Sequence, residues 1–136
     1  PEGALDGEHR DWLERRLAEA PDTPTIVAMH HPPLLTGMPA FDALGLAAED
    51  RAALAGQLRR WPQVRRVVAG HVHCASVAGL GGCVVVTSPS TWRVRPRMRL
   101  GGETFELVEG PAGFSLHAVM DGDVVSHVQS IERQSA

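Results

Sequence analysis

The sequence has 136 residues, of which 43% are hydrophobic and 21% charged, and its formal net charge is -3. A chain of this length can bury one hydrophobic core, and its small negative charge predicts no general attraction to nucleic acid or to an acidic membrane. No apolar run is long enough to span a bilayer or to mark a signal peptide, so we expect a cytoplasmic protein. In that compartment Cys74 and Cys83, the only cysteines, are expected to stay reduced.

The first half of the chain alternates helical and strand patterns. An N-cap at Asp6 and a stop at Pro21 bracket apolar residues at helical spacing. The expected elements are a helix over 7–20, a buried strand over 25–29, an irregular loop over 30–41, a helix over 47–61 and a strand over 64–69. A strand, a helix and a second strand in this order predict a parallel pair with a right-handed crossover.

The second half reads as two β-hairpins. Gly81-Gly82 and Asp121-Gly122 are dipeptides typical of tight hairpin turns, and β-rich segments flank each of them. The expected strands cover 74–80, 83–87, 114–120 and 124–131. The sequence therefore predicts an α/β fold in which a parallel β-α-β unit is followed by antiparallel or mixed hairpins.

Histidines follow both strands of the expected parallel pair. The first strand runs into His30 and His31, and the second runs through Gly70 into His71 and His73. Imidazoles held at neighbouring strand ends, beside loops open to a ligand, favour a metal site formed by His30, His71 and His73. The alternative is that these residues are polar loop histidines without a ligand.

The two histidine segments resemble a known family. His30-His31-Pro32 matches a strand ending in H-x-P, and Gly70-His71-Val72-His73 matches a strand ending in G-H-x-H, which are the last two motifs of the calcineurin-like metallophosphoesterases. The likeness extends to the bacterial class III 3',5'-cyclic-nucleotide phosphodiesterases through the His-His-x-Pro-Leu pattern, Ser88-Pro89-Ser90-Thr91 and the closing hairpin. It implies that residues 1–136 form a single partial domain, the C-terminal half of a four-layer α/β/β/α sandwich.

The resemblance also implies a chemistry for the histidines. His30 and His71 would bind one divalent ion and His73 a second, in a binuclear centre of manganese, iron or zinc that activates a hydroxide for attack on phosphorus. The substrate of the parent enzyme would be a small-molecule phosphodiester, with a cyclic nucleotide as the closest match. His31 would assist catalysis by contacting a ligand or the rim of the substrate site, or it is simply a hydrogen-bonded loop histidine.

The upstream part of the family pattern is missing. None of the motifs D-x-H, G-D and G-N-H-[DE] precedes His30, and the chain contains no asparagine. We therefore expect this fragment alone to be inactive and to hold one ion weakly or none. The competing hypothesis is a non-catalytic or partner-dependent remnant that keeps the fold. A homo-oligomer could cover the surface that the missing half would bury.

The remaining features of the sequence support weaker predictions. Alternating arginines at 93, 95, 97 and 99 favour a solvent-exposed edge of a sheet, and attraction of a phosphate group is the less favoured alternative. His117 and His127 fit cross-strand pairing in the last hairpin, and His9 fits a helix surface. Met38 and Phe41 either form a rim that contacts a nucleobase or pack within their loop.

Overall fold

The computed structural model describes residues 3–132 and confirms the mixed α/β organisation. The helices are α1 (Gly7–Ala18), α2 (Pro39–Asp42) and α3 (Ala48–Arg60). The strands are β1 (Thr25–Met29), β2 (Val64–Ala69), β3 (Ser76–Leu80), β4 (Cys83–Thr87), β5 (Val94–Pro96), β6 (Leu107–Glu109), β7 (Gly113–Met120) and β8 (Asp123–Ser130). Every expected helix and strand is present, with bounds shifted by no more than two residues. The short α2 and the β5–β6 pair were not expected.

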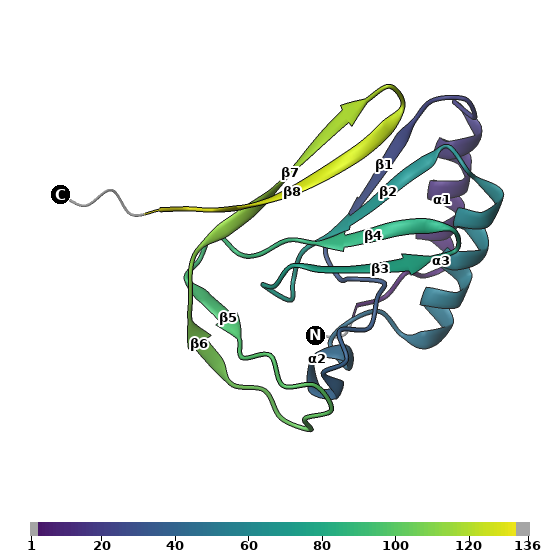
Figure 1. Cartoon of the computed structure of the whole chain (residues 1–136). Helices are drawn as coiled ribbons and strands as arrows, with labels where there is room; N and C mark the ends of the chain where they lie inside the picture. The colour runs from purple at the N-terminus through teal and green to yellow at the C-terminus, as the bar shows by residue number, and fades with distance from the viewer. Residues whose placement is uncertain (1–2, 133–136) are drawn as a thin grey trace.

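A four-stranded sheet in the order β1-β2-β4-β3 forms the centre of the fold. The pairs β1–β2 and β2–β4 are parallel, whereas β3 is antiparallel to β4. Helices α1 and α3 cover one face of this sheet (Figure 1). The core lies between these layers and contains Leu13, Leu17, Leu34, Leu54, Leu58, Val64, Val67, Cys83 and Val85. The predicted parallel β1–α3–β2 arrangement is therefore confirmed.

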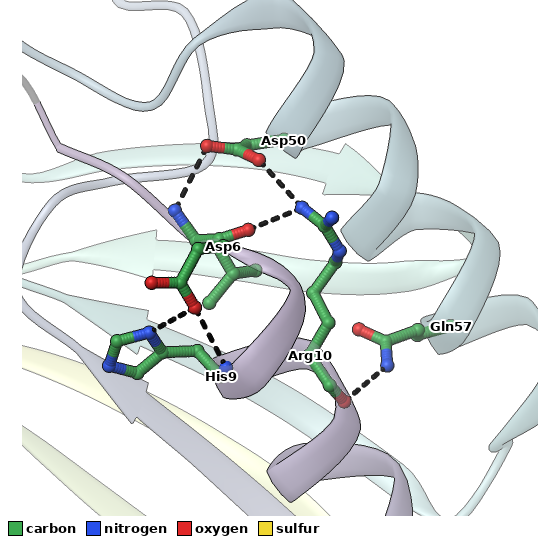
Figure 2. Close-up of polar contacts among 6 residues, drawn as sticks. Asp6, His9, Arg10, Asp50 and Gln57 are labelled. Atoms are coloured by element: carbon green, nitrogen blue, oxygen red, sulfur yellow. Dashed lines mark hydrogen bonds and ion pairs between the residues drawn. The ribbon is translucent and has the colours of Figure 1, made fainter.

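A polar network joins α1 to the start of α3 (Figure 2). As expected, the Asp6 side chain caps α1 by accepting a hydrogen bond from the His9 amide at 2.9 Å. Buried Asp50 accepts a 2.9 Å hydrogen bond from the Leu5 amide and a 2.8 Å hydrogen bond from Arg10 Nη1. Asp50 therefore fastens both the N-terminal segment and α1 to α3.

Both predicted hairpins form around turns with left-handed backbone. Gly81 and Gly82 have φ of 59° and 86°, and Asp121 and Gly122 have φ of 51° and 81°, as a type I′ turn requires. A Cβ atom at Gly81 would lie 2.3 Å from the Ala55 carbonyl oxygen, so only glycine lets this turn approach α3 so closely.

The β7–β8 hairpin lies on the side of the central sheet away from the two long helices (Figure 1). Arg66 of β2 reaches across that side and donates a hydrogen bond to the Val124 carbonyl. Ile26, Val77 and Val84 on the same side of the sheet are exposed. Within residues 3–132, no helix is both long and apolar enough to cross a membrane.

Candidate metal centre

The ends of β1 and β2 position the first two histidines. Met29 is the sheet partner of Ala69, so the two parallel strands end side by side. Beyond them, the Gly70 amide donates a 3.1 Å hydrogen bond to the His30 carbonyl and keeps the departing chains together. His30 and His71 consequently leave the same edge of the sheet, as the sequence predicted.

Three imidazoles meet at this edge. One ligand nitrogen from each of His30, His31 and His71 lies within 4.8 Å of the others. His30 Nε2 and His71 Nδ1 are 3.1 Å apart, and the ring centroids are separated by 5.0 Å for His30–His31, 4.9 Å for His30–His71 and 4.4 Å for His31–His71. We call these three residues the histidine cluster.

The path of the loop after β2 depends on two residues with positive φ and on one buried side chain. His71 and His73 have φ of 67° and 54°, a conformation that non-glycine residues seldom adopt and that is found at functional sites. Val72 between them is buried against Met38 and Phe41. The anchored Val72 side chain therefore separates the two flanking imidazoles.

His73 lies apart from the cluster. Its Nδ1 donates a 3.1 Å hydrogen bond to the Val94 carbonyl, and its ring centroid is 6.3 Å from that of Trp92. The expected convergence of His73 with His30 and His71 assumed that residues two apart point the same way, which holds only in an extended strand. Since β2 ends at Ala69, the assumption fails, and a metal role for His73 stays a prediction.

His31 takes the place in the cluster that the sequence reasoning gave to His73. Its role as a contact to a metal ligand or to the rim of the substrate site, and the alternative of a hydrogen-bonded loop histidine, both stay predictions. One signal for His31 was present in the sequence, since His31 directly follows His30, but the direction of its ring depends on tertiary contacts that a sequence pattern does not encode.

The surroundings of His71 favour its neutral imidazole. Burial lowers the pKa of His71 below its usual value, and the neighbouring His31 and His30 lower the pKa further because each would add like charge. A neutral ring presents the lone pair that a metal needs, and imidazole nitrogen suits zinc, iron and other first-row divalent ions. The three donors therefore fit a divalent metal ion.

Several weaker predictions can also be compared with the structure. Met38 and Phe41 are buried, which confirms loop packing and makes the nucleobase rim wrong for these two side chains. His117 Nδ1 lies 2.8 Å from Ser126 Oγ on the neighbouring strand, as cross-strand pairing predicts. His9 is exposed on α1, and the four arginines 93, 95, 97 and 99 are exposed along and beyond β5.

The two cysteines are free thiols, as expected. Burial raises the pKa of both Cys74 and Cys83, which disfavours the reactive thiolate. Neither thiol belongs to the histidine cluster.

No family model matches the chain. Among curated proteins, a probable cyclic nucleotide phosphodiesterase of Synechococcus is 33% identical over 135 residues, which cover 98% of this chain and 48% of that protein. A probable glycerophosphodiester phosphodiesterase of Arcobacter nitrofigilis is 32% identical over 116 residues, which cover 85% of this chain and 42% of that protein. The chain thus spans about half the length of the curated relatives it matches.

Among solved structures, the zinc-complexed Vps29 of Entamoeba histolytica is similar with 20% identity and a TM-score of 0.26, over 60% of this chain and 47% of that one. This likeness is too remote to carry a functional argument. The stronger likeness is to the curated phosphodiesterases, because it runs the length of the chain. The chain is similar to phosphodiesterases of cyclic nucleotides and glycerophosphodiesters, and its paired histidine motifs resemble those of the calcineurin-like metallophosphoesterases.

Proposed function

We propose that this chain supplies half of the metal site of a phosphodiesterase that hydrolyses small-molecule phosphodiesters, with cyclic nucleotides as the substrate class. The observation that carries the proposal is the meeting of His30 and His71 at the ends of two adjacent parallel strands. The similarity to a probable cyclic nucleotide phosphodiesterase supports the choice of substrate, and a glycerophosphodiester is the alternative.

In the complete enzyme, His30 and His71 would hold one divalent ion and His73 a second. The hydrogen bond from His73 Nδ1 to the Val94 carbonyl supports this role, because it leaves the lone pair on Nε2. A histidine that donates one ring nitrogen to a backbone carbonyl is oriented as metal ligands usually are. When bound, the metal ions would lower the pKa of a water molecule and stabilise charge on phosphate oxygens.

Arg95 is the best candidate in this chain for a contact with the substrate phosphate. It lines a hollow of about 300 Å³ together with His73, Cys74 and residues at the base of the last hairpin. A guanidinium beside a metal ligand would attract the anionic substrate and could bind two phosphate oxygens at once. Arg97 is less suited, because it already pairs with Glu106 at 2.9 Å.

This chain alone would be inactive under the same proposal. The cluster contains histidines but no carboxylate, whereas the bridging aspartate expected from the family belongs to motifs that do not precede His30.

Exposed Ile26, Val77 and Val84 would pack against the rest of the domain, or against a second copy of the chain in a homo-oligomer. Two free thiols agree with a cytoplasmic location.

The test compares this chain with a longer version that carries the upstream motifs of the family. Each is assayed for manganese-dependent hydrolysis of a chromogenic phosphodiester and of 3',5'-cyclic AMP. We expect turnover only from the longer protein, with a loss of at least about 100-fold in His71→Ala and no change in His127→Ala, which lies exposed in β8. Turnover by the short chain, or full activity in His71→Ala, would refute the proposal.

A longer protein that folds and binds metal without hydrolysing either substrate would instead support the non-catalytic remnant. That alternative keeps the histidines for stability or for a partner rather than for turnover.

A further inference from the structure

The histidine cluster contains a residue that its proposed part in a two-metal enzyme does not require. That residue is His31, whose ring centroid lies 4.4 Å from that of His71 and 5.0 Å from that of His30. The proposed two-ion site uses His30, His71 and His73, and it leaves His31 without a direct role.

The spacing of the cluster is close to that of a single zinc site. Ligand nitrogens at 2.0–2.1 Å from a tetrahedral zinc ion lie about 3.3 to 3.4 Å from one another. His30 Nε2 and His71 Nδ1 are already 3.1 Å apart, and no pair among the three ligand atoms exceeds 4.8 Å. Small rotations of the side chains would bring all three nitrogens to bonding distance.

The N-terminal segment packs directly against His31. A Cβ atom at Gly3 would lie 2.4 Å from His31 Cγ and 2.5 Å from its Cβ, closer than atoms can approach. Gly3 is itself held in place, since its amide donates a 3.2 Å hydrogen bond to the Gly45 carbonyl and it forms a parallel bridge with Leu46. The backbone of Gly3 thus packs closely against Cβ and Cγ of His31 and limits the movement of this side chain.

We propose that His31 is the third protein ligand of a single-ion site formed by His30, His31 and His71, with solvent as the fourth ligand, and that Gly3 positions the His31 ring. The site takes a divalent ion that accepts imidazole ligands, with zinc as the best match to its tetrahedral spacing. This inference deepens the metal site of the proposed function, because it shares two ligands with that site. It gives this chain a complete set of three protein ligands without any residue from outside.

The experiment measures zinc affinity of the purified chain by competition with a chromophoric chelator, and ligand number by X-ray absorption of the zinc-loaded chain. We expect one ion per chain with three imidazole nitrogens. His31→Ala and His71→Ala should each weaken binding at least about 10-fold, whereas His73→Ala and the exposed control His127→Ala should stay within about twofold of the unsubstituted chain.

The role of Gly3 has a matched control in the same segment. Gly3→Ala should weaken zinc binding by about 10- to 100-fold, as substitutions that disturb the orientation of a ligand do. Gly7→Ala adds the same methyl group where no atom lies within 4 Å, so it should leave affinity unchanged. Circular dichroism of the metal-free variants shows whether weaker zinc binding reflects loss of the fold or loss of a ligand. The X-ray absorption measurement uses the unsubstituted chain, so it tests the number of ligands even if a variant fails to fold.

The inference is overturned if His31→Ala binds zinc as well as the unsubstituted chain, or if X-ray absorption reports only two imidazoles. A loss in His73→Ala equal to that in His71→Ala would also contradict it. No phosphodiester enters these measurements, so they can fail while the proposed hydrolysis by the longer protein stands, and the reverse also holds.

Discussion

Replacing Asp50 by alanine should destabilise the protein, because Asp50 joins α3 to α1 and to the N-terminal segment. Asp50 lies in the first turn of α3, and its carboxylate accepts hydrogen bonds from the Leu5 amide and from Arg10 Nη1 (Figure 2). Its side chain is only 13% exposed, so neither group could find a full replacement in water. The substitution would therefore leave the Leu5 amide without its acceptor and would remove the carboxylate from the Arg10 guanidinium, which keeps the Leu5 carbonyl as an acceptor.

The size of the effect follows from these contacts. Hydrogen bonds to charged groups contribute about 1.5 to 3 kcal/mol each, and removing one partner of a fully buried ion pair costs about 3 to 5 kcal/mol. Because the Arg10 side chain is 32% exposed, water can solvate much of the stranded charge and the full cost does not apply. We expect Asp50→Ala to lower the free energy of unfolding by about 2 to 3 kcal/mol, a large part of the about 5 to 15 kcal/mol typical of a domain.

Urea denaturation followed by circular dichroism measures this loss. Asp50→Asn should recover roughly half of it, because the amide oxygen can still accept from Leu5, while Glu49→Ala changes an exposed neighbour and should cost less than about 0.5 kcal/mol. In the Arg10→Met background the cost of Asp50→Ala should fall by about 1 kcal/mol, since the pair is already broken. Equal losses in Asp50→Ala and Glu49→Ala would refute the reasoning.

Three further predictions concern the scaffold. Ala47 is the N-cap of α3 and makes no capping hydrogen bond, so Ala47→Ser should raise the free energy of unfolding by about 1 kcal/mol in urea titrations, and an unchanged midpoint would contradict this. Gly81→Ala should cost about 2 to 4 kcal/mol because its methyl group meets a carbonyl of α3, whereas Gly82→Ala should cost about 1 to 2 kcal/mol for its positive φ alone, and equal costs would count against the close approach. Burial and, to a smaller degree, Arg66 lower the pKa of His117, so the unfolded chain takes up a proton first and stability should fall as pH drops through about 6.5, then level off below the folded pKa. His117→Gln should flatten this part of the pH profile of the urea midpoint, and an unaltered profile would exclude His117 as its cause.

The regular elements were predictable because local signals agree with the tertiary structure. Asp6 caps α1 as its position suggested, and Gly81-Gly82 forms the turn of the β3–β4 hairpin. The short helix α2 and the β5–β6 pair could not be read in the same way. Each has three or four residues, too few to show a period, and α2 depends on the burial of Phe41.

The candidate site was predictable only as far as the strands reach. His30 and His71 were expected together because parallel neighbouring strands end at one edge, and the structure brings them within 3.1 Å. Beyond Ala69 the side-chain directions depend on the positive φ angles of His71 and His73 and on the buried Val72, none of which a periodic pattern encodes. The sequence reasoning therefore expected His73 where the structure has His31.

The most direct test of the metal centre is the anomalous diffraction of zinc in crystals of this chain. The account predicts a zinc peak at the edge of the central sheet, bonded to His30 and His71 at about 2.0 to 2.1 Å. An anomalous map of crystals grown with saturating zinc that shows no peak between these two imidazoles, or only peaks elsewhere, such as at the exposed His9–Asp6 pair, would contradict the claim that the two strand ends form a metal site.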